Sequence, residues 1–254
     1  MTNVRIERLE VEGAPAVRVV IDRADKLNAL NSYLIDAVTA AFASLAAEAD
    51  LRAVVLEGAG PKSWVVGADI AEMAGLDGPA AATFIARLHG AMRAIRDLPA
   101  PVIAKVHGFA LGAGMELAAA CDLRIASTAA RFGMPEVQVG LPSVIEASLL
   151  PRLMGLGRAG RLMLTGEVID AERAFAWGFV EEVVAPDALD GAVDAALADL
   201  CRAGVHAVRR QKRLLRQWEA MTPDAAAEAS IAEFAASFET DEPTVMLSAF
   251  TKKP

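Results

Sequence analysis

Two glutamates stand in otherwise apolar stretches of the sequence, and their residue type suits them to proton chemistry. Glu116 lies in the run GMELAAAC, and Glu136 follows Pro135 after the strand-like residues 123–126. A carboxyl group that is buried acquires a raised pKa and can then carry protons near neutral pH. Each acid could instead stabilise the N-terminus of a helix, and their separation along the chain does not place them face to face. Both interpretations remain open from the residues alone.

A glycine-rich turn precedes the first of these acids. Residues 101–106 have the length and the β-branched content of a buried strand, and Gly112 and Gly114 interrupt the chain after it. Good helix formers follow over residues 113–121, so the unpaired amides of the first turn lie at the positive end of a helix dipole and suit an anion. The turn lacks the Lys and Ser/Thr of a phosphate-binding loop, and Leu117 stands where the dinucleotide fingerprint requires glycine.

Five longer motifs extend over nearly the whole chain. They are NALN at residues 28–31, VGADIAEM at 66–73, ALGAGMELAAACDLRIASTAARFGMPEVQVGLP at 110–142, LTGEVIDAERAFAWGFVEEVV at 164–184 and AFTKK at 249–253. In these motifs and in their order, the sequence resembles the crotonase superfamily, which comprises the enoyl-CoA hydratases and isomerases. The two central motifs are specific to that family.

The resemblance implies an α/β fold, a crotonase-like spiral of ββα turns followed by a C-terminal helical region. We expect residues 1–186 to form the spiral core with the CoA site and the active site, and residues 187–254 to form a helical oligomerisation region. After Pro186 the sequence changes to helix-forming segments without strand signals. The family further implies a homotrimer or a dimer of trimers.

The chemistry of the family implies a role for each candidate residue. Addition of water to an α,β-unsaturated thioester develops negative charge on the thioester oxygen, which two aimed N–H donors stabilise. By resemblance, these donors are the backbone amides of Ala68 and Ala113. Glu116 would activate the water and Glu136 would deliver the proton, although coupled acids resist a strict division of labour. The presence of both acids favours a hydratase, because family members that only move a double bond generally manage with the second.

The substrate implied by the resemblance is an acyl-CoA thioester, with CoA as part of the substrate and with no metal or redox cofactor. The residues expected to line the CoA site are Lys26, Ala68, Asp69, Ile70 and Ala71. The basic residue of the terminal run AFTKKP is expected to approach CoA from a neighbouring subunit.

The sequence departs from the family pattern at two places. Ala113 replaces the middle one of three glycines that are common before the first glutamate, so the backbone there must tolerate negative φ. Residues 141–153, LPSVIEASLLPRL, replace a glycine-rich segment with bulkier residues that could reshape the acyl pocket. Ser143 and Glu146 form the S-x-x-E pattern of a capping box, so we expect Glu146 to cap a helix.

Composition excludes several other classes of function. The chain of 254 residues carries a net charge of -8, which argues against nucleic acid as the main partner. Its two cysteines, Cys121 and Cys201, indicate no disulfide framework and favour a reduced, cytoplasmic setting. The three histidines have no metal-ligand spacing. Neither a signal peptide nor an apolar run of membrane length is recognisable.

One basic cluster lies in a predicted helix of the C-terminal region. It comprises Arg209, Arg210, Lys212, Arg213 and Arg216. We expect a solvated helix face rather than an RNA-binding surface, because the chain is acidic and no aromatic residues are interleaved with the cations.

The sequence therefore predicts an enoyl-CoA hydratase that converts a trans-2-enoyl-CoA to the 3-hydroxyacyl-CoA. The nearest alternative is an isomerase, or a dehydratase of a specialised acyl-CoA, on the same scaffold. An alternative of a different class is a non-catalytic CoA-binding protein or an RNA-binding protein. A protein that only binds CoA has no chemical need for both glutamates.

Overall fold

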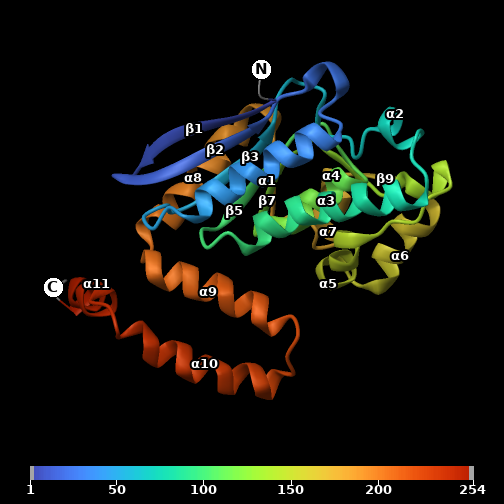
Figure 1. Cartoon of the computed structure of the whole chain (residues 1–254). Coiled ribbons are helices and arrows are strands. Elements are labelled where there is room, and N and C mark those ends of the chain that lie inside the picture. Colours follow the sequence, from blue (N-terminus) through green and yellow to red (C-terminus); the bar gives the residue numbers. More distant parts are fainter. Residues whose placement is uncertain (1–2, 252–254) are drawn as a thin grey trace.

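The computed structural model describes residues 3–251, and their strands form two sheets (Figure 1). The strands of the larger sheet are β1 (Val4–Val11), β2 (Ala14–Ile21), β3 (Val54–Gly58), β5 (Val102–Val106), β7 (Leu123–Ser127) and β10 (Glu182–Val184), in this order. β1 and β2 are antiparallel, and the other neighbours are parallel. The strands of the smaller sheet are β4 (Ser63–Val65), β6 (Phe109–Leu111), β8 (Arg131–Gly133) and β9 (Val168–Asp170).

The chain alternates between the two sheets as it winds. β3, β5 and β7 of the larger sheet are each followed directly by a strand of the smaller sheet, namely β4, β6 and β8. Helical segments then return the chain to the next strand of the larger sheet, as parallel neighbours require, and in the last turn β9 of the smaller sheet comes before α7 and β10. This arrangement confirms the predicted spiral of ββα turns.

Helices occupy most of the remaining chain. They are α1 (Ser32–Ala46), α2 (Ile70–Met73), α3 (Gly78–Asp97), α4 (Ala113–Ala120), α5 (Leu150–Met154), α6 (Leu156–Thr165), α7 (Ala171–Ala176), α8 (Leu189–Arg202), α9 (Val205–Trp218), α10 (Pro223–Ser237) and α11 (Glu242–Thr251). Short 3₁₀ segments are η1 (Ala24–Lys26), η2 (Pro135–Val139), η3 (Ile145–Leu149) and η4 (Pro186–Ala188). Polar side chains cap several of the helix starts; for example, the side chain of Asn31 accepts from the N–H of Leu34, and that of Asp77 accepts from the N–H of Ala80.

Helices cover both faces of the larger sheet. α1, α3 and α4 contribute to the main core, in which Trp64 is fully buried, as expected for a packing residue. On the opposite face, α8 packs Leu189, Val193 and Leu197 against strand residues such as Ile103. Figure 1 shows α8 behind the strands, with α1 and α3 in front of them. α8 therefore packs with the α/β body, and α10 and α11 lie farther from it (Figure 1).

The basic cluster of α9 is not a solvated face, so that prediction is wrong. Lys212 is 6% exposed, and its ammonium group donates to Oδ2 of Asp122 at 2.7 Å and to two backbone carbonyls. Arg209 donates to the carbonyl oxygens of Glu48 and Leu51, each at 2.9 Å. These cations dock α9 onto the body, because they bind carbonyl groups near the C-terminal end of α3 and in the segments that follow α1 and α3.

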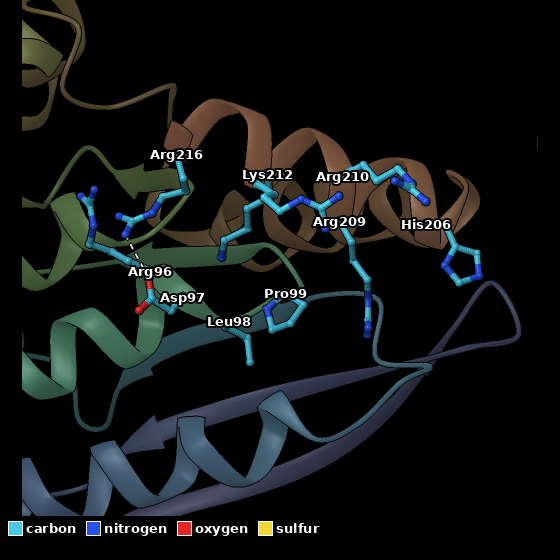
Figure 2. A pocket seen from close by; sticks show the side chains of 10 residues that line it. Arg96, Asp97, Leu98, Pro99, His206, Arg209, Arg210, Lys212 and Arg216 are labelled. Carbon is cyan, nitrogen blue, oxygen red and sulfur yellow. Dashed lines mark hydrogen bonds and ion pairs between the residues drawn. The ribbon is translucent and has the colours of Figure 1, made fainter. Parts of the chain in front are cut away.

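A cavity of about 530 Å³ separates α9 from the end of α3, and cationic side chains line most of it (Figure 2). Arg216 spans this basic cavity to Asp97, at 2.9 Å. Arg96 pairs with Glu219, which follows α9, and Arg213 pairs with Glu233 of α10. Carboxylates of the chain thus neutralise much of the positive charge that the sequence places in α9.

Two further features bear on the excluded classes of function. Cys121 and Cys201 are free and buried, and burial raises the pKa of the Cys121 thiol to about 12, as expected for a core residue rather than a nucleophile. No helix within residues 3–251 is long and apolar enough to cross a membrane.

Removal of the Lys212 ammonium group tests how α9 is docked. In Lys212→Ala, Asp122 and the carbonyls of Ile95 and Ala100 each lose one hydrogen-bond donor, so we expect the free energy of unfolding to fall by about 2–3 kcal/mol. Arg213→Ala removes a half-exposed cation of the same helix and should cost less than about 1 kcal/mol. Urea unfolding at one fixed protein concentration measures both, and equal losses in the two variants would contradict the docking role.

Candidate active site

The N-terminus of α4 is fixed by two glycines that leave no room for a side chain. Gly112 has φ 52° and ψ -124°, and a Cβ at this position would overlap Oε1 of Glu136. A Cβ at Gly114 would overlap the carbonyl oxygen of Val65 in β4. The helix start is therefore pressed against the smaller sheet, and every residue of Ala113–Ala120 is buried.

The structure brings the two candidate acids together at this helix. Glu116 is 3% exposed on α4, and Glu136 on η2 lies beside the turn at Gly112. Both line a cavity of about 300 Å³, here called the active-site cavity. Burial, and next the negative charge of Glu136, raises the pKa of Glu116 to about 8. A carboxyl group in this state can take up and release a proton near neutral pH.

A short segment after η2 holds both acids. Oε1 of Glu116 accepts a hydrogen bond from the N–H of Ala147 at 3.1 Å. Oε2 of Glu136 accepts one from the hydroxyl group of Ser143 at 2.9 Å. Because the two donors are only a few residues apart, they limit how far the two carboxyl groups can move relative to each other.

The capping box predicted at Ser143 and Glu146 does not form. Val144 occupies the N-cap position of η3, and no side chain caps it. Ser143 donates to Glu136 instead, since a hydrogen bond to a carboxylate is stronger than one between neutral groups. Glu146 is buried, with its Oε1 2.9 Å from Nδ1 of His89 on α3. The third acid of this region therefore lies inside the protein, where the sequence predicted a cap.

The two backbone amides expected to form an oxyanion hole border the same cavity. Ala68 and Ala113 both line it, and within residues 3–251 neither N–H donates a hydrogen bond to the protein. A Cβ at Gly67 would lie 3.5 Å from the backbone nitrogen of Ala113, so the two loops approach closely. Ala113 is the first residue of α4 and has no positive φ, as its replacement of glycine requires.

The rest of the cavity wall is mostly apolar and comes from separate parts of the chain. Its apolar side chains are Val66, Ile70, Met73, Ile85, Leu88, Val139, Leu141 and Val144. Leu141 and Val144 belong to the segment that departs from the family pattern, so this segment does border the pocket. A cavity with this lining suits an aliphatic chain that ends in one polar, reacting group.

The two segments expected at the CoA site lie side by side. The N–H of Leu30 donates to the carbonyl of Gly67 at 2.8 Å, and the N–H of Asp69 donates to the carbonyl of Leu30 at 2.9 Å. The carboxylate of Asp69 pairs with Arg23 at 2.6 Å and caps α2 through the N–H of Ala71 at 3.0 Å. The bond to Arg23 lowers the pKa of Asp69. The carboxylate of Asp69 therefore already has hydrogen-bond partners within the protein.

The residues predicted for the CoA site divide into two groups. Ala68 and Ile70 line the active-site cavity, and Ile70 is 64% exposed at its rim. Lys26, Asp69 and Ala71 do not line that cavity, and Lys26 is exposed at the end of η1. Lys252 and Lys253, the basic residues of the terminal run, lie outside the described residues.

Sequence reasoning missed several residues that shape the site. Asn28 is fully buried, and its side-chain amide donates to the carbonyls of Ala59, Ser63 and Trp64, which ties the Lys26 segment to β4. Its left-handed backbone, with φ 59°, is a conformation that Asn tolerates, and this was the available signal in the NALN motif. The roles of Arg23, Ser143 and His89 left no such signal, because each depends on a partner in another element of the structure.

The structure offers no obvious metal centre in the part of the chain that it describes. No group of three or more His, Cys, Asp or Glu side chains within residues 3–251 is arranged to hold a metal ion. The chemistry that the site can perform with its own groups is proton transfer by two carboxyls and stabilisation of an anion by two amides.

Known proteins similar to this chain share one description. The model of the family described as Enoyl-CoA hydratase/isomerase matches residues 13–253. Over 246 residues the chain is 36% identical to a short-chain-enoyl-CoA hydratase of Clostridium acetobutylicum and 37% identical to a crotonyl-CoA hydratase of Syntrophomonas wolfei. Each alignment covers 96% of this chain and 94% of the relative.

Comparison with solved structures indicates the same family. The crystal structure of an enoyl-CoA hydratase from Mycobacterium smegmatis matches with a TM-score of 0.95 at 32% identity, and the match covers 99% of this chain and 97% of that one. These similarities confirm the resemblance to the crotonase superfamily that the motifs indicated. The chain belongs to the enoyl-CoA hydratase/isomerase family.

Proposed function

We propose that this protein is an enoyl-CoA hydratase, which adds water to a trans-2-enoyl-CoA thioester and gives the 3-hydroxyacyl-CoA. The observation that carries the proposal is the arrangement of the active-site cavity, where Glu116 and Glu136 meet the backbone amides of Ala68 and Ala113. The hydratase names of relatives that align over nearly the full chain support it.

The two amides would bind the thioester oxygen. As water adds to the β-carbon, negative charge develops on this oxygen, and donors aimed at it lower the barrier. Ala113 lies at the N-terminus of α4, so the helix dipole adds positive potential at the same point. The apolar wall keeps the acyl chain in place and limits competing water.

The two glutamates would transfer the protons of the reaction. We assign Glu116 to the activation of water, because its raised pKa of about 8 makes it a strong base once it is ionised. We assign Glu136 to protonation of the α-carbon. Ionised Glu116 would take one proton from the water while Glu136 gives one proton to the α-carbon, so the pair holds one proton before and after the addition.

This chemistry favours hydration over the alternatives. Movement of a double bond needs one group to carry a proton, whereas addition of water also needs a base for the water, and the cavity provides both acids. The reaction changes no net oxidation state, so the proposal includes neither a redox cofactor nor a metal, and CoA enters as part of the substrate. Lys26 and residues 68–71 are proposed to bind CoA.

The C-terminal helices support an oligomer, which we propose to be a homotrimer or a dimer of trimers. α10 and α11 leave large apolar side chains exposed, with Ile231 65%, Phe234 71%, Phe238 54% and Val245 59% accessible. Exposed apolar side chains gathered on neighbouring helices commonly mark a protein interface. We retain residues 187–254 as the oligomerisation region, although α8 packs on the sheet.

The proposed location is the cytoplasm. Two free, buried thiols are compatible with a reduced compartment.

The first prediction concerns the two glutamates. Glu116→Gln and Glu136→Gln keep the side-chain size but remove the proton-carrying group, so each should lower kcat by about 10²–10⁴-fold and change KM little. Loss of the conjugated thioester absorbance of crotonyl-CoA measures the rate. Glu172→Gln on α7 serves as the control, since this acid is exposed. Near-normal turnover in either active-site variant would remove that glutamate from the mechanism.

The second prediction concerns the Ala113 amide. Ala113→Pro deletes the N–H at the first position of α4, where proline is compatible with a helix, and should lower kcat by about 10²–10³-fold. Ala113→Gly retains the N–H and should have a mild effect. The same assay, with circular dichroism to confirm folding, measures both variants. A folded, fully active Ala113→Pro protein would exclude this oxyanion donor.

The third prediction concerns assembly. The double substitution of Phe234→Glu and Phe238→Glu places charge on the exposed apolar surface of α10, so sedimentation velocity should show a shift from oligomer to monomer. Tyr33→Glu changes a similarly exposed aromatic residue on α1 and should leave the oligomer intact. A wild-type protein that sediments as a monomer would contradict the proposed assembly.

A further inference from the structure

A third carboxyl group, that of Glu146, is buried close to the two proposed catalytic acids. The residue is 5% exposed on η3, which packs against α4. Its Oε1 lies 2.9 Å from Nδ1 of His89, and its Oε2 is buried without a hydrogen-bond partner among the residues that the structure describes. A buried carboxyl oxygen without a partner destabilises a fold, so this arrangement calls for a functional explanation.

The backbone beside Glu146 is strained. Ile145 has φ 44°, a left-handed conformation that is a clear outlier for a β-branched residue. Its side chain is partly buried against the main core. Strain of this kind persists only where surrounding contacts impose it, and it clusters at functional sites. Here it turns the chain so that Glu146 points inward and Ala147 follows at the start of η3.

Glu146 is linked to Glu116 in two ways. Ala147, its neighbour in the chain, donates the hydrogen bond of 3.1 Å that Oε1 of Glu116 accepts. In addition, the negative charge of Glu146 opposes ionisation of Glu116. Hydrogen bonding to His89 anchors Glu146 to α3, so the position of Ala147 and the local charge both depend on this pair.

We propose that Glu146, held by His89, is a positioning residue that controls the charge and the orientation of Glu116. For its place in catalysis, the inference rests on the hydratase function proposed above. Glu146 itself lies outside the lining of the active-site cavity, so it acts through Glu116 and not on the substrate.

The other elements around Glu116 add few competing charges. Glu136 on η2 is the larger electrostatic influence, and Glu146 on η3 is the smaller one. β4 and β6 carry no ionisable side chains. On α3, which also packs on α4, Arg87, Arg93 and Arg96 pair with Asp36, Asp97 and Glu219. Arg152 on α5 binds the carbonyl of Glu219, and Arg124 binds carbonyls at the C-terminal end of α4. Substitution of Glu146 by Gln therefore removes one identified negative charge from the surroundings of Glu116.

The test compares Glu146→Gln with the wild-type protein and with Glu10→Gln, which removes a charge from the exposed edge strand β1. The first readout is the titration of the Glu116 carboxyl, followed by carbon-13 NMR of glutamate-labelled protein and assigned by its loss in Glu116→Gln. The second readout is the pH profile of kcat/KM with crotonyl-CoA. The NMR titration does not depend on activity, so an inactive wild-type protein would refute the proposed function and leave this inference testable.

We expect Glu146→Gln to move the Glu116 midpoint, and the ascending limb of the pH profile, to lower pH by about half a pH unit, because a like charge is lost. Glu10→Gln should move neither. A folded Glu146→Gln protein with the wild-type midpoint and profile overturns the inference.

A second variant tests the anchor and covers the case in which Glu146→Gln does not fold. His89→Ala keeps the Glu146 carboxyl but removes its hydrogen-bond partner, so Ala147 should hold Glu116 less firmly. We expect kcat to fall about tenfold with KM nearly unchanged. Wild-type kcat in His89→Ala would overturn the positioning role.

Discussion

The close approach of α4 to β4 is the constraint on which the site depends. Gly114 lies against the carbonyl of Val65 with no space for a Cβ, and Gly112 turns the chain into the helix with a backbone that favours glycine. This contact sets the first turn of α4 beside the loop of Ala68. It therefore places the free N–H of Ala113 and, one turn later, the carboxyl of Glu116 around one point.

Burial of α4 has an electrostatic consequence. Every residue of α4 is buried, so no solvent stabilises an ionised Glu116. Burial, and next the negative charge of Glu136, raises the pKa of Glu116 to about 8. The same packing that makes the helix stable thus prepares an acid that can exchange protons. Ser143 and Ala147 then orient the two carboxyls through hydrogen bonds from one short segment.

Sequence reasoning identified the parts of the fold that local patterns and motifs encode. The ββα spiral and the residues Glu116, Glu136, Ala68 and Ala113 followed from the family motifs, and the structure places these four residues around one cavity. Spacing alone could not have done so, because η2 reaches α4 only through the pairing of β6 with β8.

The predictions that failed share one physical cause. The pattern at Ser143 and Glu146 is that of a capping box, but the partly buried carboxylate of Glu136 on η2 competes for the hydroxyl group. The cations of α9 have the spacing of a solvated face, yet Lys212 binds Asp122 and backbone carbonyls of the body. In both cases the deciding partner belongs to another element of the structure, and a helix-capping or charge pattern carries no information about it.

The central claim is that water adds to an enoyl thioester in the active-site cavity. The most direct measurement incubates the purified protein with crotonyl-CoA, and with a longer trans-2-enoyl-CoA, in oxygen-18-labelled water, and identifies the products by mass spectrometry and NMR. The account predicts a 3-hydroxyacyl-CoA that carries one labelled oxygen on the β-carbon. A product in which the double bond has moved and no oxygen has been added would contradict it.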